Sequence, residues 1–131
     1  MNPETQHGRA CRVLRLLALA GYSAIVLWLS LTPKPPELSG DFLGWDKAQH
    51  AAAYGLLTLL AGRAFQLYLT PPGRAWLAAA LYALLLGGLM EVAQGAMTQG
   101  RFAEPQDLLA NAIGTAAVFA WARSRCREGR A

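Results

Sequence analysis

The chain has 131 residues, of which 54% are hydrophobic and 15% are charged, and its formal net charge is +4. Soluble domains carry about 25% charged residues, so this composition excludes an ordinary soluble globular protein. The length limits the chain to a single domain.

Four apolar stretches follow one another, at residues 13–31, 48–69, 75–93 and 108–122. A helix needs about 20 residues to cross a hydrocarbon core of about 30 Å, and the first three stretches meet that length. The fourth is shorter, and would cross only if Asp107 and the preceding loop enter the headgroup region. Backbone groups in lipid must pair internally, which favours helices. We therefore predict an all-α integral membrane bundle of four transmembrane helices.

The first stretch has the basic start of a signal peptide but is too long for one. It continues to Leu31 and ends without a small-residue cleavage site, so we expect an uncleaved first span. The chain then divides into a polar N-terminus at 1–12, the membrane bundle at 13–122 and a basic tail at 123–131.

Basic residues predict the orientation of this bundle. Four spans place both termini on one side, together with the loop between the second and third spans. That side holds nine of the twelve cations: Arg9, Arg12, Arg15, Arg63, Arg74, Arg123, Arg125, Arg127 and Arg130. The other side holds Lys34, Lys47 and Arg101. Loops rich in Lys and Arg stay in the cytoplasm, so both termini are predicted to be cytoplasmic.

Tryptophans agree with this placement, since Trp28 and Trp45 fall at the outer interface and Trp76 and Trp121 at the inner one. The arginines after residue 122 are explained as a topology anchor near anionic lipid, which argues against nucleic acid as a partner.

The two cysteines fall on the cytoplasmic side, where thiols stay reduced. Neither Cys11 nor Cys126 has a metal-ligand neighbour. The sequence predicts no disulfide, no metal site and no cofactor.

The strongly polar side chains within the spans all fall in the outer half. Ionisable and amide groups at this depth usually face a bundle interior and mark function. Helical spacing of three or four residues places them in stripes: Asp46, His50 and Tyr54; Glu91 and Gln94; Asp107, Asn111, Gly114 and Thr115. With Lys47 and Arg101 added, we expect a polar pocket at this end, whose candidate ligand-binding residues are Asp46, Lys47, His50, Tyr54, Glu91, Gln94, Arg101, Asp107 and Asn111.

Each of these residues also has a structural explanation. Asp46 and Asp107 can cap helices, and Gln94 and Asn111 can join helices by hydrogen bonds. Glu91 is the hardest to explain in this way, because a carboxylate in a membrane needs a cation or a proton. We expect Arg101, Lys47 or His50 as its partner.

The same group could perform acid–base chemistry, and the candidate catalytic residues are His50, Glu91 and Asp107. His50 would act as the base, Glu91 or Asp107 would orient it, and Arg101 would hold an anion. One histidine with carboxylates is a weak ligand set for zinc or iron.

The motif residues resemble the VanZ-like family, small bacterial membrane proteins named for a member that gives low-level teicoplanin resistance. The resemblance is carried by Asp46-Lys47-x-x-His50-x-x-x-Tyr54, Glu91-x-x-Gln94, Arg101 and Asp107-x-x-x-Asn111-x-x-Gly114. It covers about residues 13–122 and implies a multi-pass protein of the bacterial cytoplasmic membrane that influences the cell envelope. It does not imply a role in antibiotic resistance for this chain.

Three functions stay open on the sequence. The first is a binding module for a polar envelope or lipid-linked ligand, and the second is a small membrane enzyme that acts on a lipid headgroup or cell-wall precursor. The third is an accessory subunit of a membrane complex. The sequence leaves the oligomeric state open.

Overall fold

All four predicted helices are present, and the described part of the chain is otherwise turn. The computed structural model describes residues 3–32, 45–96 and 105–128, with side chains from residue 8 and, in the second range, from residue 47. The helices are α1 (Pro3–Leu31), α2 (Trp45–Phe65), α3 (Pro72–Ala96) and α4 (Pro105–Glu128).

Prolines set two of the helix starts. Pro72 and Pro105 are the first residues of α3 and α4, where a missing amide hydrogen is no loss and the ring favours the helical φ. The expected second stretch, which reached residue 69, is too long. α2 ends at Phe65 and the chain tightens into a turn, in which the amide of Leu67 donates to the carbonyl of Ala64 at 3.1 Å.

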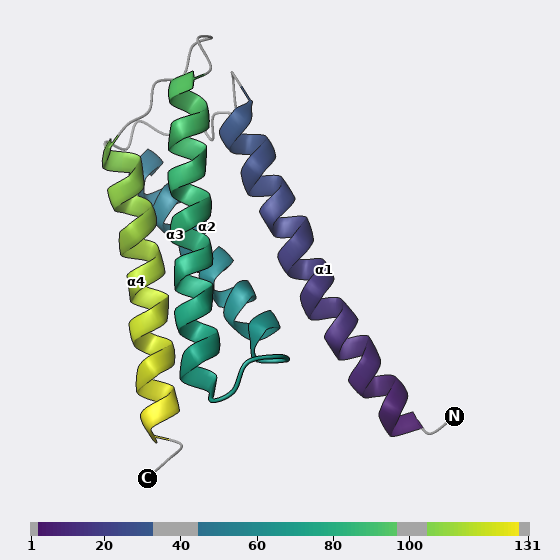
Figure 1. The fold of residues 1–131 in the computed structure, drawn as a ribbon. Coiled ribbons are helices and arrows are strands. Elements are labelled where there is room, and N and C mark those ends of the chain that lie inside the picture. The colour runs from purple at the N-terminus through teal and green to yellow at the C-terminus, as the bar shows by residue number, and fades with distance from the viewer. Residues whose placement is uncertain (1–2, 33–44, 97–104, 129–131) are drawn as a thin grey trace.

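Helices α2, α3 and α4 pack against one another, whereas α1 leans against α2 and α3 and, in the described residues, does not contact α4 (Figure 1). The most extensive packing is between α2 and α4. The start of α1 and the end of α4 lie at the same end of the bundle. We call this the arginine end, and call the opposite end, where α2 and α4 begin, the site end.

Glycine permits the close crossing of α2 and α4. A Cβ at Gly114 would overlap the backbone carbonyl of Ala51, and one at Gly55 would lie 3.3 Å from the carbonyl oxygen of Gly114. A larger side chain at position 114 would therefore force the two backbones apart. Small residues at such crossings are typical of helices that associate in lipid.

Polar contacts attach α1 to its neighbours. The Tyr22 hydroxyl donates to the Ala53 carbonyl at 3.2 Å, and the hydroxyls of Ser23 and Tyr82 lie 2.8 Å apart. Near the arginine end, Arg15 donates to the Arg63 carbonyl at 3.3 Å. These contacts supply directional attachment for a helix that buries little of its own surface.

Two of the helices are long and apolar enough to span a membrane, namely residues 8–31 of α1 and all of α3. The most apolar 18 residues of each helix are mostly exposed. In α1, 11% of them are buried inside the bundle, and in α3, 33%. Large apolar side chains are exposed on all four helices, among them Leu17, Trp28, Leu56, Leu85, Val92 and Leu109.

One tryptophan does not match the expected aromatic belt. Trp76 is buried, packing against Gly62 and, edge to face, against Trp121 with ring centroids 6.5 Å apart. Trp28 and Trp121 are exposed, as expected. The space above Gly62 accepts the Trp76 ring, so this indole fills the core.

Candidate functional site

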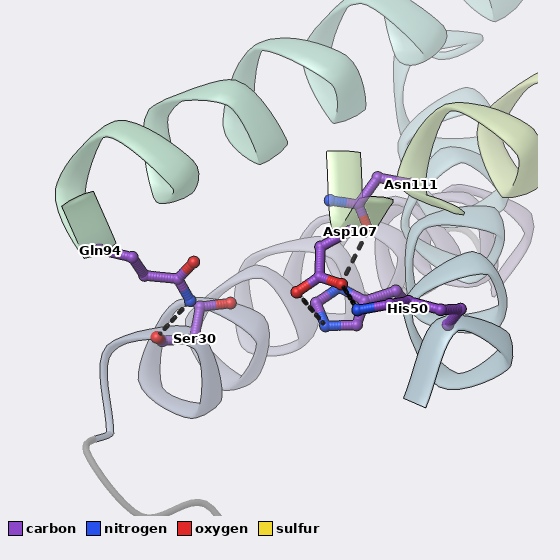
Figure 2. Close-up of polar contacts among 6 residues, drawn as sticks. Ser30, His50, Gln94, Asp107 and Asn111 are labelled. Carbon is purple, nitrogen blue, oxygen red and sulfur yellow. Dashed lines mark hydrogen bonds and ion pairs between the residues drawn. The ribbon is translucent and has the colours of Figure 1, made fainter. Parts of the chain in front are cut away.

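Four polar side chains from α2 and α4 meet at the site end. Asp107 lies between Lys47 and His50: one carboxylate oxygen accepts a hydrogen bond from the Lys47 ammonium, and the other lies 3.5 Å from Nε2 of His50. Nδ1 of His50 lies 3.2 Å from Oδ1 of Asn111. Figure 2 shows these side chains converging from two helices.

The place of Asp107 in its helix differs from the expected N-cap. α4 begins at Pro105, so Asp107 lies inside the first turn. Its carboxylate is turned toward α2 and its side chain is only 12% exposed. A negative charge in the first turn also interacts favourably with the helix dipole. The carboxylate therefore joins two helices while it stabilises the start of its own.

Asn111 contacts Nδ1 of His50, the ring nitrogen that does not face Asp107. The Asn111 side chain is almost fully buried, at 2% exposure. If its carbonyl oxygen faces the ring, as the structure has it, Nδ1–H donates to it and the other nitrogen is directed toward Asp107. Asp107, one of the two carboxylates expected to orient His50, therefore lies at Nε2, and Asn111 is the residue at Nδ1.

A second polar layer lies deeper between the same helices. Tyr54 is buried, and its ring lies against Gly87 of α3, where a Cβ would come within 3.0 Å of Cε1. The same Cβ would lie 3.2 Å from Nδ2 of Asn111. Below Tyr54, the Thr58 hydroxyl donates to the Tyr54 carbonyl at 2.8 Å and lies 3.3 Å from the Thr115 hydroxyl.

The two layers form a polar column along the α2–α4 seam. On α4 it follows positions 107, 111 and 115, and on α2 it follows positions 50, 54 and 58. Beyond Thr58 and Thr115 toward the arginine end, the buried residues on these two helices are Ala61, Gly62, Ala64 and Ala122. Within the described residues, the column therefore opens toward the site end and is closed below Thr58.

Glu91 and Gln94 lie on α3, and their side chains have different surroundings. The half-buried Glu91 lies one turn beyond Gly87, within electrostatic range of Tyr54. Gln94 is turned away from the cluster, and its amide donates to the Ser30 carbonyl of α1 at 2.8 Å, as Figure 2 shows. Gln94 therefore makes an interhelical contact of the kind considered for it, and this contact does not join it to Lys47, His50, Asp107 and Asn111.

Two predicted polar side chains cannot be placed beside these. Arg101 lies outside the described residues, and so does the side chain of Asp46. The expected ion pair between Glu91 and Arg101 therefore involves a residue outside the described ones. The described residues contain no group of three His, Cys, Asp or Glu side chains that could hold a metal ion.

Thr58 is the residue of the column that sequence reasoning missed. Its position continues the spacing of His50 and Tyr54 by another four residues, so the signal was present. A threonine inside an apolar run carries little weight by itself, because its hydroxyl can bond to its own helix.

No protein-family model, curated protein or solved structure matches this chain. What the chain does is therefore inferred from its own residues.

Proposed function

We propose that the chain is a VanZ-like integral membrane protein of the bacterial cytoplasmic membrane that binds a polar envelope or lipid-linked ligand. All four helices span the membrane, both termini are cytoplasmic, and the site end opens to the outside. The pocket holds the ligand through Lys47, His50, Asp107 and Asn111.

The outer surface of the bundle supports the membrane placement. The shortest helix has 21 residues, which corresponds to about 30 Å at 1.5 Å per residue. Exposed large apolar side chains occur on every helix, and a surface of this kind needs lipid or a partner to cover it.

α2 and α4 are less apolar than α1 and α3 for a reason that favours four spans. Within the span, their polar residues include His50, Thr58, Asn111 and Thr115, which turn toward each other along the seam. A membrane helix tolerates polar residues on a face that is buried in protein. Low average hydropathy in these two helices is therefore compatible with crossing.

The arrangement of charges supports the orientation. Arg63, Arg74, Arg123, Arg125 and Arg127 belong to the arginine end, and basic segments stay in the cytoplasm. The site end then faces outward, where envelope components are exposed.

The convergence of Lys47, His50, Asp107 and Asn111 is the observation that carries the binding proposal. A cation, a carboxylate, an imidazole and an amide meet in one partly exposed place, with side-chain exposures of 30% for Lys47 and 19% for His50. Interhelical bonding alone requires fewer groups. The mixture can recognise a headgroup that carries both hydrogen-bond donors and acceptors.

Lipids that copurify with the protein test the proposal. The protein is extracted in mild detergent, and bound lipids are identified by mass spectrometry for the wild type, His50→Ala and His7→Ala. The His7 variant is the matched control, because it removes the chain's other histidine. We expect one polar lipid class to be retained by the wild type and the control, and depleted in His50→Ala. Equal lipid profiles in all three would contradict the pocket and favour the accessory subunit.

The contact between His50 and Asn111 favours an enzyme as the second candidate. With Nδ1–H donating to Asn111 and Nε2 facing the Asp107 carboxylate, a protonated His50 could give its Nε2 proton to a ligand as a general acid, and Lys47 lies beside it to stabilise a developing negative charge. An enzyme predicts the opposite result for His50→Ala: unreacted substrate would accumulate on the protein instead of being lost.

A further inference from the structure

Two arginines from different helices lie against one turn at the arginine end. The guanidinium of Arg74 donates to the Thr70 carbonyl at 3.4 Å. Nη1 of Arg123, from the last part of α4, lies 3.4 Å from the position of a Cβ at Gly73. Both guanidinium groups are therefore held at residues 70–74, between the end of α2 and the start of α3.

No carboxylate in the described residues balances this pair. The first turn of α3 contains no acidic residue, and the ion pairs among described side chains include neither Arg74 nor Arg123. Arg123 instead lies over the ring of Phe119, with Cζ 5.8 Å from the centroid. Arg125, two residues farther along α4, differs in being paired with Glu128 at 3.6 Å.

The geometry points to a site at Arg74 and Arg123 for a phosphate group, supplied by an anionic phospholipid of the inner leaflet. Two guanidinium groups can share the oxygens of a phosphate through charge-assisted hydrogen bonds. Both side chains are exposed, so the phosphate can reach them. This site is separate from the pocket at the site end and does not depend on what that pocket binds.

The position of Arg74 and Arg123 relative to the membrane favours the phosphate of a lipid over free phosphate. The exposed Trp121 lies two residues before Arg123 on α4, and tryptophan and arginine together mark the headgroup region of a membrane. Phe119 holds the Arg123 guanidinium at the same level. A phosphate carried on a lipid is present there at high local concentration.

The test uses the full-length protein in mild detergent and measures bound phosphatidylglycerol by native mass spectrometry, with phosphatidylcholine as the neutral-headgroup probe. We expect phosphatidylglycerol to bind more tightly than phosphatidylcholine. Arg123→Gln and Arg74→Gln should each lower its apparent affinity about fivefold, on the scale of one basic residue near anionic lipid. Inorganic phosphate in millimolar excess should displace little of it.

Arg125→Gln is the matched control, because it removes the same charge from the same helix but from a residue already paired with Glu128. It should change the affinity by less than about twofold. An equal loss in Arg123→Gln and Arg125→Gln would overturn the site and leave only diffuse attraction. Complete displacement by inorganic phosphate would overturn the choice of a lipid.

Discussion

Glu91 raises the question of whether a carboxylate inside the bundle is structural or functional. Replacing it by glutamine preserves its shape and its capacity for hydrogen bonds but removes its charge. If the charge of Glu91 contributes to ligand binding, Glu91→Gln should accumulate in the membrane normally and lose the copurifying polar lipid, whereas a purely structural Glu91 should leave both quantities unchanged. Quantitative immunoblotting of membranes and lipid mass spectrometry on the same preparations measure the two quantities.

Asp107→Asn provides the companion experiment. Asparagine keeps the size of the side chain but weakens the interaction with Lys47, so we expect loss of the lipid and a loss of stability of about 1–3 kcal/mol. Normal lipid retention in both variants would mean that these carboxylates only hold helices together, and the accessory-subunit interpretation should then be preferred.

Gly87 and its neighbour Gly88 can be compared, because a Cβ added at each position would meet different surroundings. A Cβ at Gly87 would press on Asn111 and Tyr54, whereas a Cβ at Gly88 meets nothing within 4 Å. We predict that Gly87→Ala changes the ring ¹⁵N shifts of His50, because Asn111 must move by a few tenths of an ångström. Gly88→Ala should leave these shifts unchanged.

This measurement is made by NMR in a His7→Gln background, where His50 is the sole histidine. Identical His50 spectra for the two glycine variants would show that Asn111 does not transmit the change. The structure would then be wrong about the contact between Asn111 and His50.

Spacing along single helices predicted which residues of this cluster share a helix face. It could not predict how each helix is rotated about its own axis relative to its neighbours. The four-residue intervals at His50 and Tyr54, and at Asp107 and Asn111, correctly placed each set on one face. The sequence could not tell which residue of α4 meets which nitrogen of His50. For the same reason the sequence could not tell that Gln94 meets α1, since one face of α3 meets α1 and another meets α2 and α4.

At the scale of the helices, the α2–α4 crossing is the most sensitive element. We predict that Gly114→Ala destabilises the bundle by at least about 1–3 kcal/mol, because the added methyl meets backbone that cannot rotate away. Gly55→Ala should cost less, since its Cβ would touch the neighbouring helix at 3.3 Å. Unfolding in mixed micelles measures both.

Gly21→Ala is the control for these two variants, because a Cβ at Gly21 has nothing within 4 Å. It should be neutral or slightly stabilising, as expected when alanine replaces an exposed helical glycine. If Gly114→Ala were as stable as Gly21→Ala, the close approach of α2 and α4 would be incorrect.

Helix existence followed from the apolar stretches, whereas helix ends did not. The stretches mark where side chains prefer lipid or core, but α4 continues to Glu128 through a polar, basic segment. The end of α2 was placed four residues too late, because hydropathy does not register the turn that precedes the two prolines.

At the scale of the whole molecule, the charge asymmetry predicts the topology. Reporter fusions within residues 32–46 and near Arg101 should read as external, and a fusion after Arg123 should read as cytoplasmic. The reason is the excess of arginine at the end that holds both termini. An external C-terminus would reverse the orientation and place the polar pocket on the cytoplasmic side.

The closed lower end of the polar column has a consequence for the energy supply of the cell. The hydroxyl and amide groups of the column reach as far as Thr58 and Thr115, and the buried residues beyond them include Ala61 and Ala122. Apolar packing of this kind resists the passage of ions. In the proposed orientation, the site would therefore stay in equilibrium with one compartment only, and a cell that held many copies of this protein would not discharge the electrochemical gradient across its membrane.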